Sequence, residues 1–262
     1  MGRVRIRLHR PLPDGATIKQ VVIKRTGTGE WYATFQIELP EMAVERHTEP
    51  AVGIDLGLEH FAALSTGELV PNPRWFRGSE EALARAQRQR ARCKRGSRHY
   101  RELSRRITRL HEKIARQRRD FQHKLSRRLA REFGLIAVER LSVQGLARSR
   151  LAKSVHDAAW SQFLFFLGYK GAETGSQVIE VAASGTSQEC ARCGCVVPKS
   201  LSEREHVCPS CGFTAPRDVN AALNILFRGT ARAEPPRKGL LLPVGLKVSI
   251  NQRAEVAGSR RL

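Results

Sequence analysis

Two pairs of cysteines constrain this 262-residue chain more than any other feature of its sequence. They form Cys190-Ala-Arg-Cys193-Gly and Cys208-Pro-Ser-Cys211-Gly, with 14 residues between the pairs. Each Cys-x-x-Cys unit lets two thiolates converge on one tetrahedral ion, so the spacing predicts a zinc ribbon. Zn²⁺ would be structural, because four thiolates leave no position open for a substrate. A segment this short buries too little apolar surface to fold alone, and the metal would supply its folding energy.

The same cysteines also fit two disulfides in a secreted domain. The basic N-terminus, Met1-Gly2-Arg3-Val4-Arg5, is not followed by the apolar stretch of a signal peptide, which argues against secretion. Cys195 and His206 are alternative ligands, and Cys193 is favoured over Cys195 because a glycine follows it.

The charge of the chain indicates its partner. It has 46 Lys and Arg against 25 Asp and Glu, a formal net charge of +21. No apolar run approaches the ~18 residues of a membrane helix, so we expect a cytoplasmic protein with no membrane partner. A surplus this large implies an anionic partner, and nucleic acid is the first candidate.

Most of this charge falls within residues 79–131, which hold 19 Lys and Arg and only five acids. Leu103, Ile107, Leu110 and Ile114 open an apolar stripe of helical period. We expect two helices, about Glu80–Arg95 and Arg98–Arg131, with Ser97 capping the second. The alternative is a merely solvated helix face, but such faces mix both signs. Arginine predominates, which suits phosphate contacts. The predicted contacts are Arg98, Arg101, Arg105, Lys113, Arg118 and Lys124.

The order of elements predicts an α/β protein. Residues 1–48 read as strands of a partial, wedge-like β-barrel that needs partners. Residues 49–185 alternate strands with the basic helices and a helix at Ser154–Lys170, the order of a ribonuclease-H-like core with residues 79–131 as an insertion. A zinc ribbon (186–213), a final helix (214–228) and a disordered tail (229–262) follow. The expected core strands are Ala51–Leu56, Phe61–Ser65, Glu68–Val70, Leu135–Glu139 and Gln177–Val181.

Three acids stand out against this order. Asp55 lies inside an apolar strand, Glu139 ends a second apolar strand, and Asp218 falls in the first turn of the last helix. Each has an ordinary explanation alone, as a turn carboxylate, a surface residue or a helix-start charge. Together they suit a catalytic cluster that holds two Mg²⁺ ions for phosphodiester hydrolysis.

Six segments carry a resemblance to a known family. In the order of the chain they are Gly-Ile-Asp-Leu-Gly (53–57), Arg-Arg-Asp-Phe-Gln-His-Lys-Leu-Ser (118–126), Ala-Val-Glu-Arg-Leu-Ser-Val-Gln-Gly-Leu (137–146), Asp-Ala-Ala-Trp-Ser-Gln-Phe (157–163), Thr-Ser-Gln-Glu-Cys-Ala-Arg-Cys-Gly (186–194) and Arg-Asp-Val-Asn-Ala-Ala-Leu-Asn-Ile (217–225). The chain resembles the TnpB family, the OrfB-type transposases of insertion sequences, which are related to type V CRISPR effectors.

The resemblance implies a RuvC-like nuclease core with Asp55, Glu139 and Asp218 as its metal triad. Family members bind a guide RNA from the transposon end and cut DNA, so base pairing reads sequence while the protein holds the backbone. The companion transposase of the element is at most an indirect partner. We therefore predict a transposon-associated RNA-guided DNA endonuclease. The alternative is a non-cleaving guide-RNA and DNA-binding protein or a decayed remnant, because full-length relatives carry further domains before the equivalent of Gly2.

Overall fold

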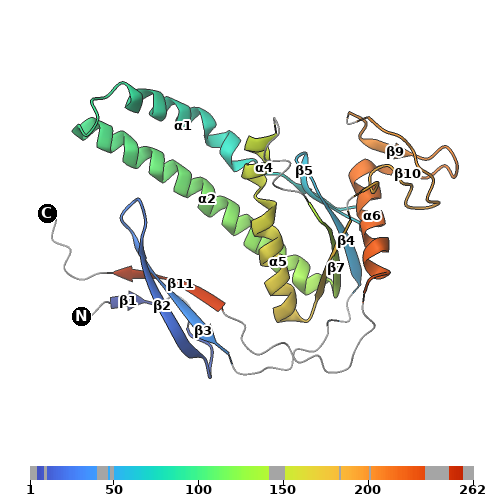
Figure 1. The fold of residues 1–262 in the computed structure, drawn as a ribbon, viewed down its shortest axis with the longest axis horizontal. Coiled ribbons are helices and arrows are strands. Elements are labelled where there is room, and N and C mark those ends of the chain that lie inside the picture. The colour runs from blue at the N-terminus through green and yellow to red at the C-terminus, as the bar shows by residue number, and fades with distance from the viewer. Residues whose placement is uncertain are drawn as a thin grey trace. The chain divides into compact units, whose positions relative to one another are not determined.

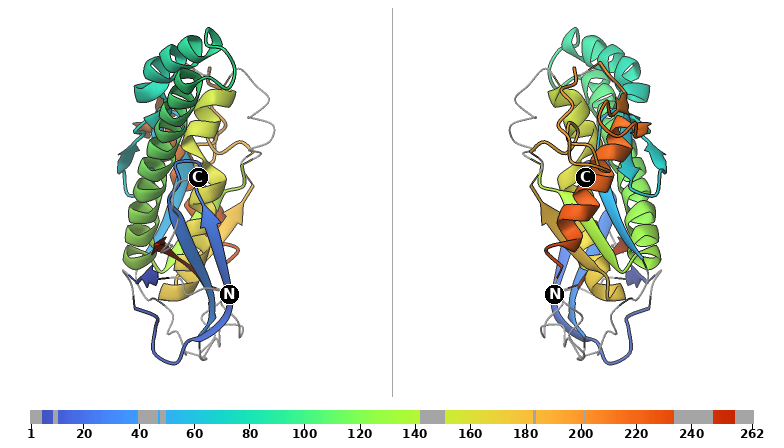
Figure 2. Two further views of the ribbon diagram at one scale, coloured as in Figure 1. Left: turned by 90° about the vertical axis from the view of Figure 1, so that its left-hand side faces the viewer. Right: turned by 90° about the vertical axis from the view of Figure 1, so that its right-hand side faces the viewer.

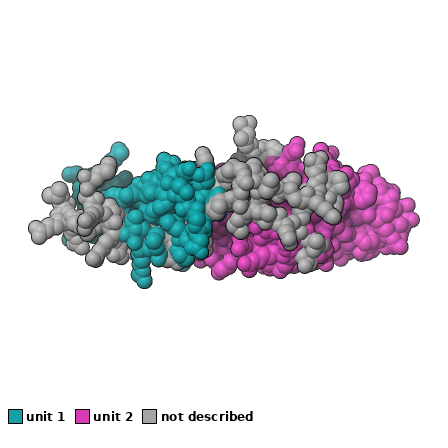
Figure 3. Space-filling view, turned by 90° about the horizontal axis from the view of Figure 1, so that it is seen from below, with its two compact units in different colours: residues 1–43, 80–113, 241–262 teal, residues 44–79, 114–240 magenta. Residues whose placement is uncertain are grey.

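A computed structural model of the protein describes residues 5–8, 11–39, 47, 50–141, 151–182, 184–200, 202–233 and 248–255. Two compact units make up the chain, coloured separately in Figure 3. Unit 1 comprises residues 1–43, 80–113 and 241–262, and unit 2 comprises residues 44–79 and 114–240.

The sheet of unit 1 has four antiparallel strands in the order β1-β11-β3-β2. The strands are β1 (Arg5–Arg7), β2 (Thr17–Arg25), β3 (Trp31–Glu38) and β11 (Val248–Glu255). Alternation along β3 buries Ala33, Phe35 and Ile37 on one face, as its pattern predicts. The three strands expected near the N-terminus are therefore present, and their sheet gains a fourth strand from the C-terminal segment.

That fourth strand corrects the expectation of a disordered tail over residues 229–262. β11 lies between β1 and β3, and α6 (Arg217–Thr230) extends past residue 229. The remaining tail residues, 234–247 and 256–262, lie outside the described part of the chain. The strand escapes sequence reasoning because the backbone groups that pair with it are some two hundred residues away in the chain.

The basic segment forms the predicted helices, α1 (Trp75–Ala91) and α2 (Arg98–Glu132), seen as the long hairpin of Figure 1. Ser97 caps α2 as expected, since its hydroxyl accepts a hydrogen bond from the Tyr100 N–H at 3.2 Å. The first helix begins five residues before the expected Glu80. Its start is stabilised by Asp157, whose carboxylate accepts the Phe76 N–H at 3.0 and 3.1 Å.

Unit 2 is built on a five-stranded sheet in the order β6-β5-β4-β7-β8. The two hairpins β4–β5 and β5–β6 are antiparallel, whereas β4–β7 and β7–β8 are parallel. The expected core strands are confirmed to within a residue at each end. Their observed bounds are β4 (Ala51–Leu56), β5 (His60–Leu64), β6 (Leu69–Pro71), β7 (Leu135–Glu139) and β8 (Gln177–Val181).

Helices cover both faces of this sheet (Figures 1 and 2). On one face, Val52 and Ile54 of β4 pack with Leu129 of α2 and Phe163 of α5 (Trp160–Thr174) in the main core. On the other face lies α6. The helix expected over Ser154–Lys170 is divided into α4 (Ala152–Ala158) and α5 by Ala159, which has φ 50°. None of the described helices combines the length and the apolar composition that a membrane-spanning segment requires.

Candidate metal centre and acidic site

Strand alternation places Asp55 and Glu139 on the same side of the sheet. β4 and β7 are parallel neighbours whose last registered pair is Ile54 with Val138. Ile54 and Val138 point into the core beneath α2 and α5. The next residue of each strand therefore points to the opposite face, where α6 lies. The two predicted acids thus emerge side by side at the carboxyl ends of two parallel strands.

Close contact between α6 and the sheet brings in the third acid. A Cβ atom on Gly53 would lie 2.0 Å from the Ala222 carbonyl oxygen, so only glycine lets α6 approach β4 this closely. At the other end of the helix, a Cβ atom on Gly229 would lie 2.3 Å from Cβ of Ala137. Asp218 stands in the first turn of α6, where its carboxylate is paired with Arg217 at 3.1 Å.

The electrostatics of the trio are those of crowded anions. Burial raises the pKa of Asp55 well above its usual value, and the nearby charges of Glu139 and Asp218 raise it further. Arg217 opposes this shift. Burial also raises the pKa of Glu139, with partial compensation from its hydrogen bond with Asp55. Carboxylates held together in a partly buried site gain stability from a bound cation, and their oxygens are the donors that Mg²⁺ prefers.

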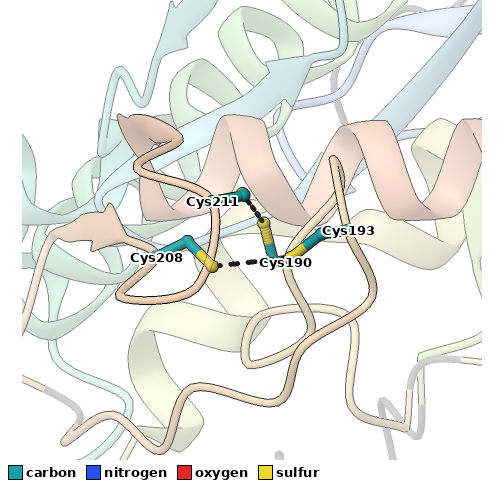
Figure 4. A group of neighbouring side chains, drawn as sticks. All are labelled: Cys190, Cys193, Cys208 and Cys211. Atoms are coloured by element: carbon teal, nitrogen blue, oxygen red, sulfur yellow. Dashed lines mark hydrogen bonds between the residues drawn. The ribbon is translucent and has the colours of Figure 1, made fainter.

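The four predicted cysteines form a single cluster (Figure 4). Their sulfur atoms all lie within 4.8 Å of one another, with Cys190 to Cys211 at 3.7 Å and Cys193 to Cys208 at 3.6 Å. Tetrahedral Zn²⁺ with Zn–S distances of ~2.3 Å needs sulfur atoms ~3.8 Å apart, so the cluster fits zinc. Within the described residues, no other group of three or more His, Cys, Asp or Glu ligands is this compact, and the acidic trio is wider.

The turns around the cluster explain the glycine after each pair. Gly194 and Gly212 have φ of 75° and 71°, a region that other residues rarely adopt. Their N–H groups donate to the carbonyls of Cys190 and Cys208 at 2.9 Å. Burial opposes ionisation of the Cys208 thiol, but the N–H groups of Cys211 and Ser210 lower its pKa to about 6. The thiolate, the form that binds metal, is therefore favoured at Cys208. At Cys193 the Cys195 N–H lowers the pKa, but hydrogen bonds with the neighbouring thiols and burial raise it to about 12.

Neither alternative ligand joins the cluster. Cys195 directs its thiol toward the Val196 carbonyl, which supports the choice of Cys193. His206 is fully buried and hydrogen-bonded to Lys199. The cysteine module also carries a short β-hairpin, β9 (Glu205–Val207) with β10 (Thr214–Pro216), whose second strand leads directly into α6.

Sequence reasoning missed the polar contacts that connect the cysteine module to α6. Asn220 accepts a hydrogen bond from the Ala191 N–H at 3.0 Å and donates one to the Glu189 carbonyl at 2.8 Å. Asn224, one turn later, donates to the same carbonyl at 2.7 Å. Arg228 extends the row with an ion pair to the Glu189 carboxylate at 2.8 Å. The spacing of four was the available signal, since it puts three polar side chains on one face of an otherwise apolar helix.

Of the six predicted basic contacts, one is largely buried and five are exposed. Arg118 is largely buried and pairs with Asp157 at 2.9 Å, so it belongs to the interior of unit 2 rather than to a free surface. Arg98 and Lys124 are exposed and pair with acids on their own helix, Glu102 and Asp120. The other predicted contacts, all exposed on α2, are Arg101, Arg105 and Lys113.

The chain is thus an α/β protein with a mixed central sheet, a crowded acidic trio and a four-cysteine cluster that fits zinc. Residues 34–150 match the OrfB_IS605 family, described as "Probable transposase", and residues 160–225 match the Cas12f1-like TNB domain. "Putative RNA-guided DNA endonuclease" of Streptomyces pristinaespiralis is 39% identical over 86% of this chain and 56% of its own length. "Putative RNA-guided DNA endonuclease InsQ" of Escherichia coli K12 is 32% identical over 88% of this chain and 61% of its own length.

The chain belongs to the TnpB family of transposon-associated proteins. A cryo-EM structure of a CRISPR-Cas12f ternary complex supports the fold, with a TM-score of 0.50 and 20% identity over 84% of this chain and 46% of that one. The chain spans little more than half the length of the curated relatives it matches.

Proposed function

We propose that this chain contains the catalytic core of an RNA-guided DNA endonuclease, built on a ribonuclease-H-like sheet of RuvC type. The observation that carries this proposal is the meeting of Asp55, Glu139 and Asp218 at one side of the sheet, with their charges acting on one another. The order of strands, β6-β5-β4-β7-β8, supports it, because Asp55 and Glu139 stand near the carboxyl ends of adjacent parallel strands. We infer RNA and DNA as partners from the curated relatives, which are named putative RNA-guided DNA endonucleases.

The three carboxylates would hold two Mg²⁺ ions. Such ions activate a water molecule and stabilise the leaving oxygen of a phosphodiester. The protein's own contribution is placement: the Gly53 contact fixes α6, and α6 fixes Asp218 opposite the two strand ends. Arg217 tempers the repulsion among the acids.

The remaining parts have supporting roles in this proposal. The cysteine cluster would hold one structural Zn²⁺, which orders a segment with little apolar core of its own. Guide RNA and DNA would contact the exposed cations of α2, of which Arg98, Arg101, Arg105, Lys113 and Lys124 are available and Arg118 is not. Base pairing would select the target, and these contacts would hold the backbone.

Nicking of supercoiled plasmid tests the proposal. The protein is purified with the RNA it retains from its host and is assayed with and without Mg²⁺ on plasmids carrying the matching target. Asp55→Ala and Glu139→Ala are each expected to lower the Mg²⁺-dependent rate by about 10³-fold. Glu180→Gln is the matched control, because Glu180 is an exposed acid of the neighbouring strand β8 whose ion pair, with Arg140, lies on the surface.

Equal rates for wild type and Asp55→Ala would overturn the nuclease assignment. Retained RNA with no Mg²⁺-dependent nicking would instead favour a non-cleaving guide-binding protein.

A further inference from the structure

The turn between β2 and β3 forms a groove with α2, all within unit 1. The groove is about 530 Å³ in volume, and its lining combines the turn, residues 26–29, with three arginines: Arg25 of β2 and Arg105 and Arg109 of α2. None of these arginines has an acidic partner among the described residues. By contrast, arginines further along α2, such as Arg127 and Arg128, pair with Glu173 and Glu68.

The groove is held in place by two contacts that do not involve its cations. Thr28 donates its hydroxyl hydrogen to the Glu112 carboxylate, whose two oxygens lie at 2.7 and 2.9 Å. A Cβ atom on Gly27 would lie 2.9 Å from the Thr108 methyl group, so a larger residue at this position would force the turn or the Thr108 side chain to shift. The turn therefore rests on α2 at Thr108 and Glu112, on the same stretch of helix that carries Arg105 and Arg109.

The polar chemistry of the groove favours a phosphate. Guanidinium groups bind phosphate oxygens in a planar, bidentate manner, and threonine hydroxyls add donors. Thr26 and Thr28 line the same groove, and their hydroxyl oxygens are 2.9 Å apart. The Arg25 guanidinium is itself oriented, since it lies over the Trp31 ring at 5.7 Å. Three guanidiniums in one groove, with no acid of the described residues paired to them, repel one another, and a bound anion would relieve this repulsion.

The surroundings of the groove favour a linear polyanion over a compact one. Arg101, Arg105, Arg109 and Lys113 are all exposed and recur every four residues on α2. A spacing of four residues is ~6 Å along a helix, so the four cations form a row along α2, and the middle two, Arg105 and Arg109, line the groove. A free phosphate or an isolated carboxylate would use only part of this row.

We infer that Arg25, Arg105 and Arg109 form a binding site for the phosphodiester backbone of a nucleic-acid strand, positioned by the Thr28–Glu112 contact. The inference rests on the proposed function for the identity of the polyanion, but it does not require that the chain cleave it. Phosphate contacts of this kind fix the register of a strand and carry no sequence information.

Salt-dependent binding tests the site. The full chain is titrated, in Mg²⁺-free buffer to prevent cleavage, against fluorescein-labelled 20-nucleotide single strands of RNA and of DNA with the same sequence. Fluorescence anisotropy is recorded between 50 and 400 mM NaCl. Arg105→Gln/Arg109→Gln is expected to weaken binding about tenfold at 100 mM NaCl and to reduce the slope of log K against log[NaCl] by ~1.4, about 0.7 for each phosphate that the variant no longer neutralises. A change confined to RNA or to DNA assigns the groove to that strand.

Matched variants separate the site from net charge and from folding. Arg88→Gln/Arg106→Gln removes two exposed arginines of the same hairpin that do not line the groove, and it should leave the slope nearly unchanged. Arg105→Lys/Arg109→Lys keeps both charges and should preserve most of the slope, which a purely structural role would not predict. Equal losses in the two glutamine pairs, or an unchanged slope in Arg105→Gln/Arg109→Gln, would overturn the inference. Asp55→Ala should bind like the wild type, so failure of the nuclease proposal stays distinguishable.

Discussion

The side chain of Asn220 accepts a hydrogen bond from the backbone N–H of Ala191, at 3.0 Å. Ala191 follows Cys190 of the cysteine cluster, and Asn220 comes two residues after Asp218. One fully buried amide therefore connects the cysteine cluster to the helix that carries the third acid. We expect the integrity of the cysteine cluster and the placement of Asp218 to be coupled through this contact, because a shift of either one would stretch or break a buried hydrogen bond.

This coupling predicts the behaviour of Asn220→Ala. The change leaves the Ala191 N–H unsatisfied and removes a donor to the Glu189 carbonyl, so we expect the free energy of unfolding to fall by about 2–4 kcal/mol. The rate at which a chelator removes zinc should also rise, and a colorimetric zinc indicator measures this rate. Ser202→Ala, an exposed change in the same module, serves as the control. Unchanged stability and zinc release in Asn220→Ala would show that the two sites are independent.

A methyl group on Gly53 should be severely disruptive. Its carbon would lie 2.0 Å from the Ala222 carbonyl oxygen and 2.6 Å from the Leu226 backbone nitrogen, so α6 must move away from the sheet. We expect Gly53→Ala to cost at least ~3 kcal/mol and to abolish Mg²⁺-dependent nicking. Urea unfolding and the plasmid assay measure the two effects.

Gly168→Ala makes the same chemical change where there is room for it. Gly168 lies within α5, and a Cβ there would meet nothing within 4 Å. Alanine is the better helix former, so this variant should be more stable than the wild type by about 0.5–1 kcal/mol. If both glycine variants lost stability equally, the close approach of α6 would not be the cause.

The cysteine cluster predicts about one zinc per chain. Cys190→Ser should lose the metal, and residues 184–212 should become susceptible to protease, because their order depends on it. Cys195→Ser should retain both zinc and protease resistance, since Cys195 lies outside the cluster. Elemental analysis and limited proteolysis provide the measurements. A folded wild-type chain without zinc would contradict the assignment.

Asp157 should matter far more than most acids of the chain. Its carboxylate pairs with Arg118 and accepts the Phe76 N–H that begins α1, and its side chain is only 8% exposed. Asp157→Ala would leave a largely buried guanidinium without its partner and the start of α1 without its cap. We expect the free energy of unfolding, measured with urea, to fall by about 3–5 kcal/mol. Glu102→Ala breaks an exposed pair with Arg98 and should leave stability unchanged within error. Similar losses in both variants would contradict this distinction.

Several elements were accessible from the sequence because their causes are local. The apolar runs of β4 and β7 and the helical stripe of α2 repeat with the periods of strand and helix, and Ser97 caps the helix that follows it. The turn at each Cys-x-x-Cys unit is also a local feature, since it is formed by the cysteine pair and the glycine that follows it. These features depend on neighbours a few residues away.

Other features were decided by partners far along the chain. β11 is a strand because β1 and β3 offer it unpaired backbone groups, and α1 begins at Trp75 because Asp157 accepts the Phe76 N–H. Arg118 reads as one more surface arginine until the fold places Asp157 beside it. The groove lined by Arg25, Arg105 and Arg109 forms where Gly27 and Thr28 of the β2–β3 turn contact α2.

The sequence by itself singled out the residues that we propose carry the chemistry: three acids, four cysteines and a strongly basic helix. Tertiary structure alone decided which of them meet, because strand register and the close approach of α6 at Gly53 bring Asp218 to Asp55 across more than 160 positions of the chain. The secondary structure of a segment depends largely on its own residues, whereas contacts between distant residues depend on how the segments pack.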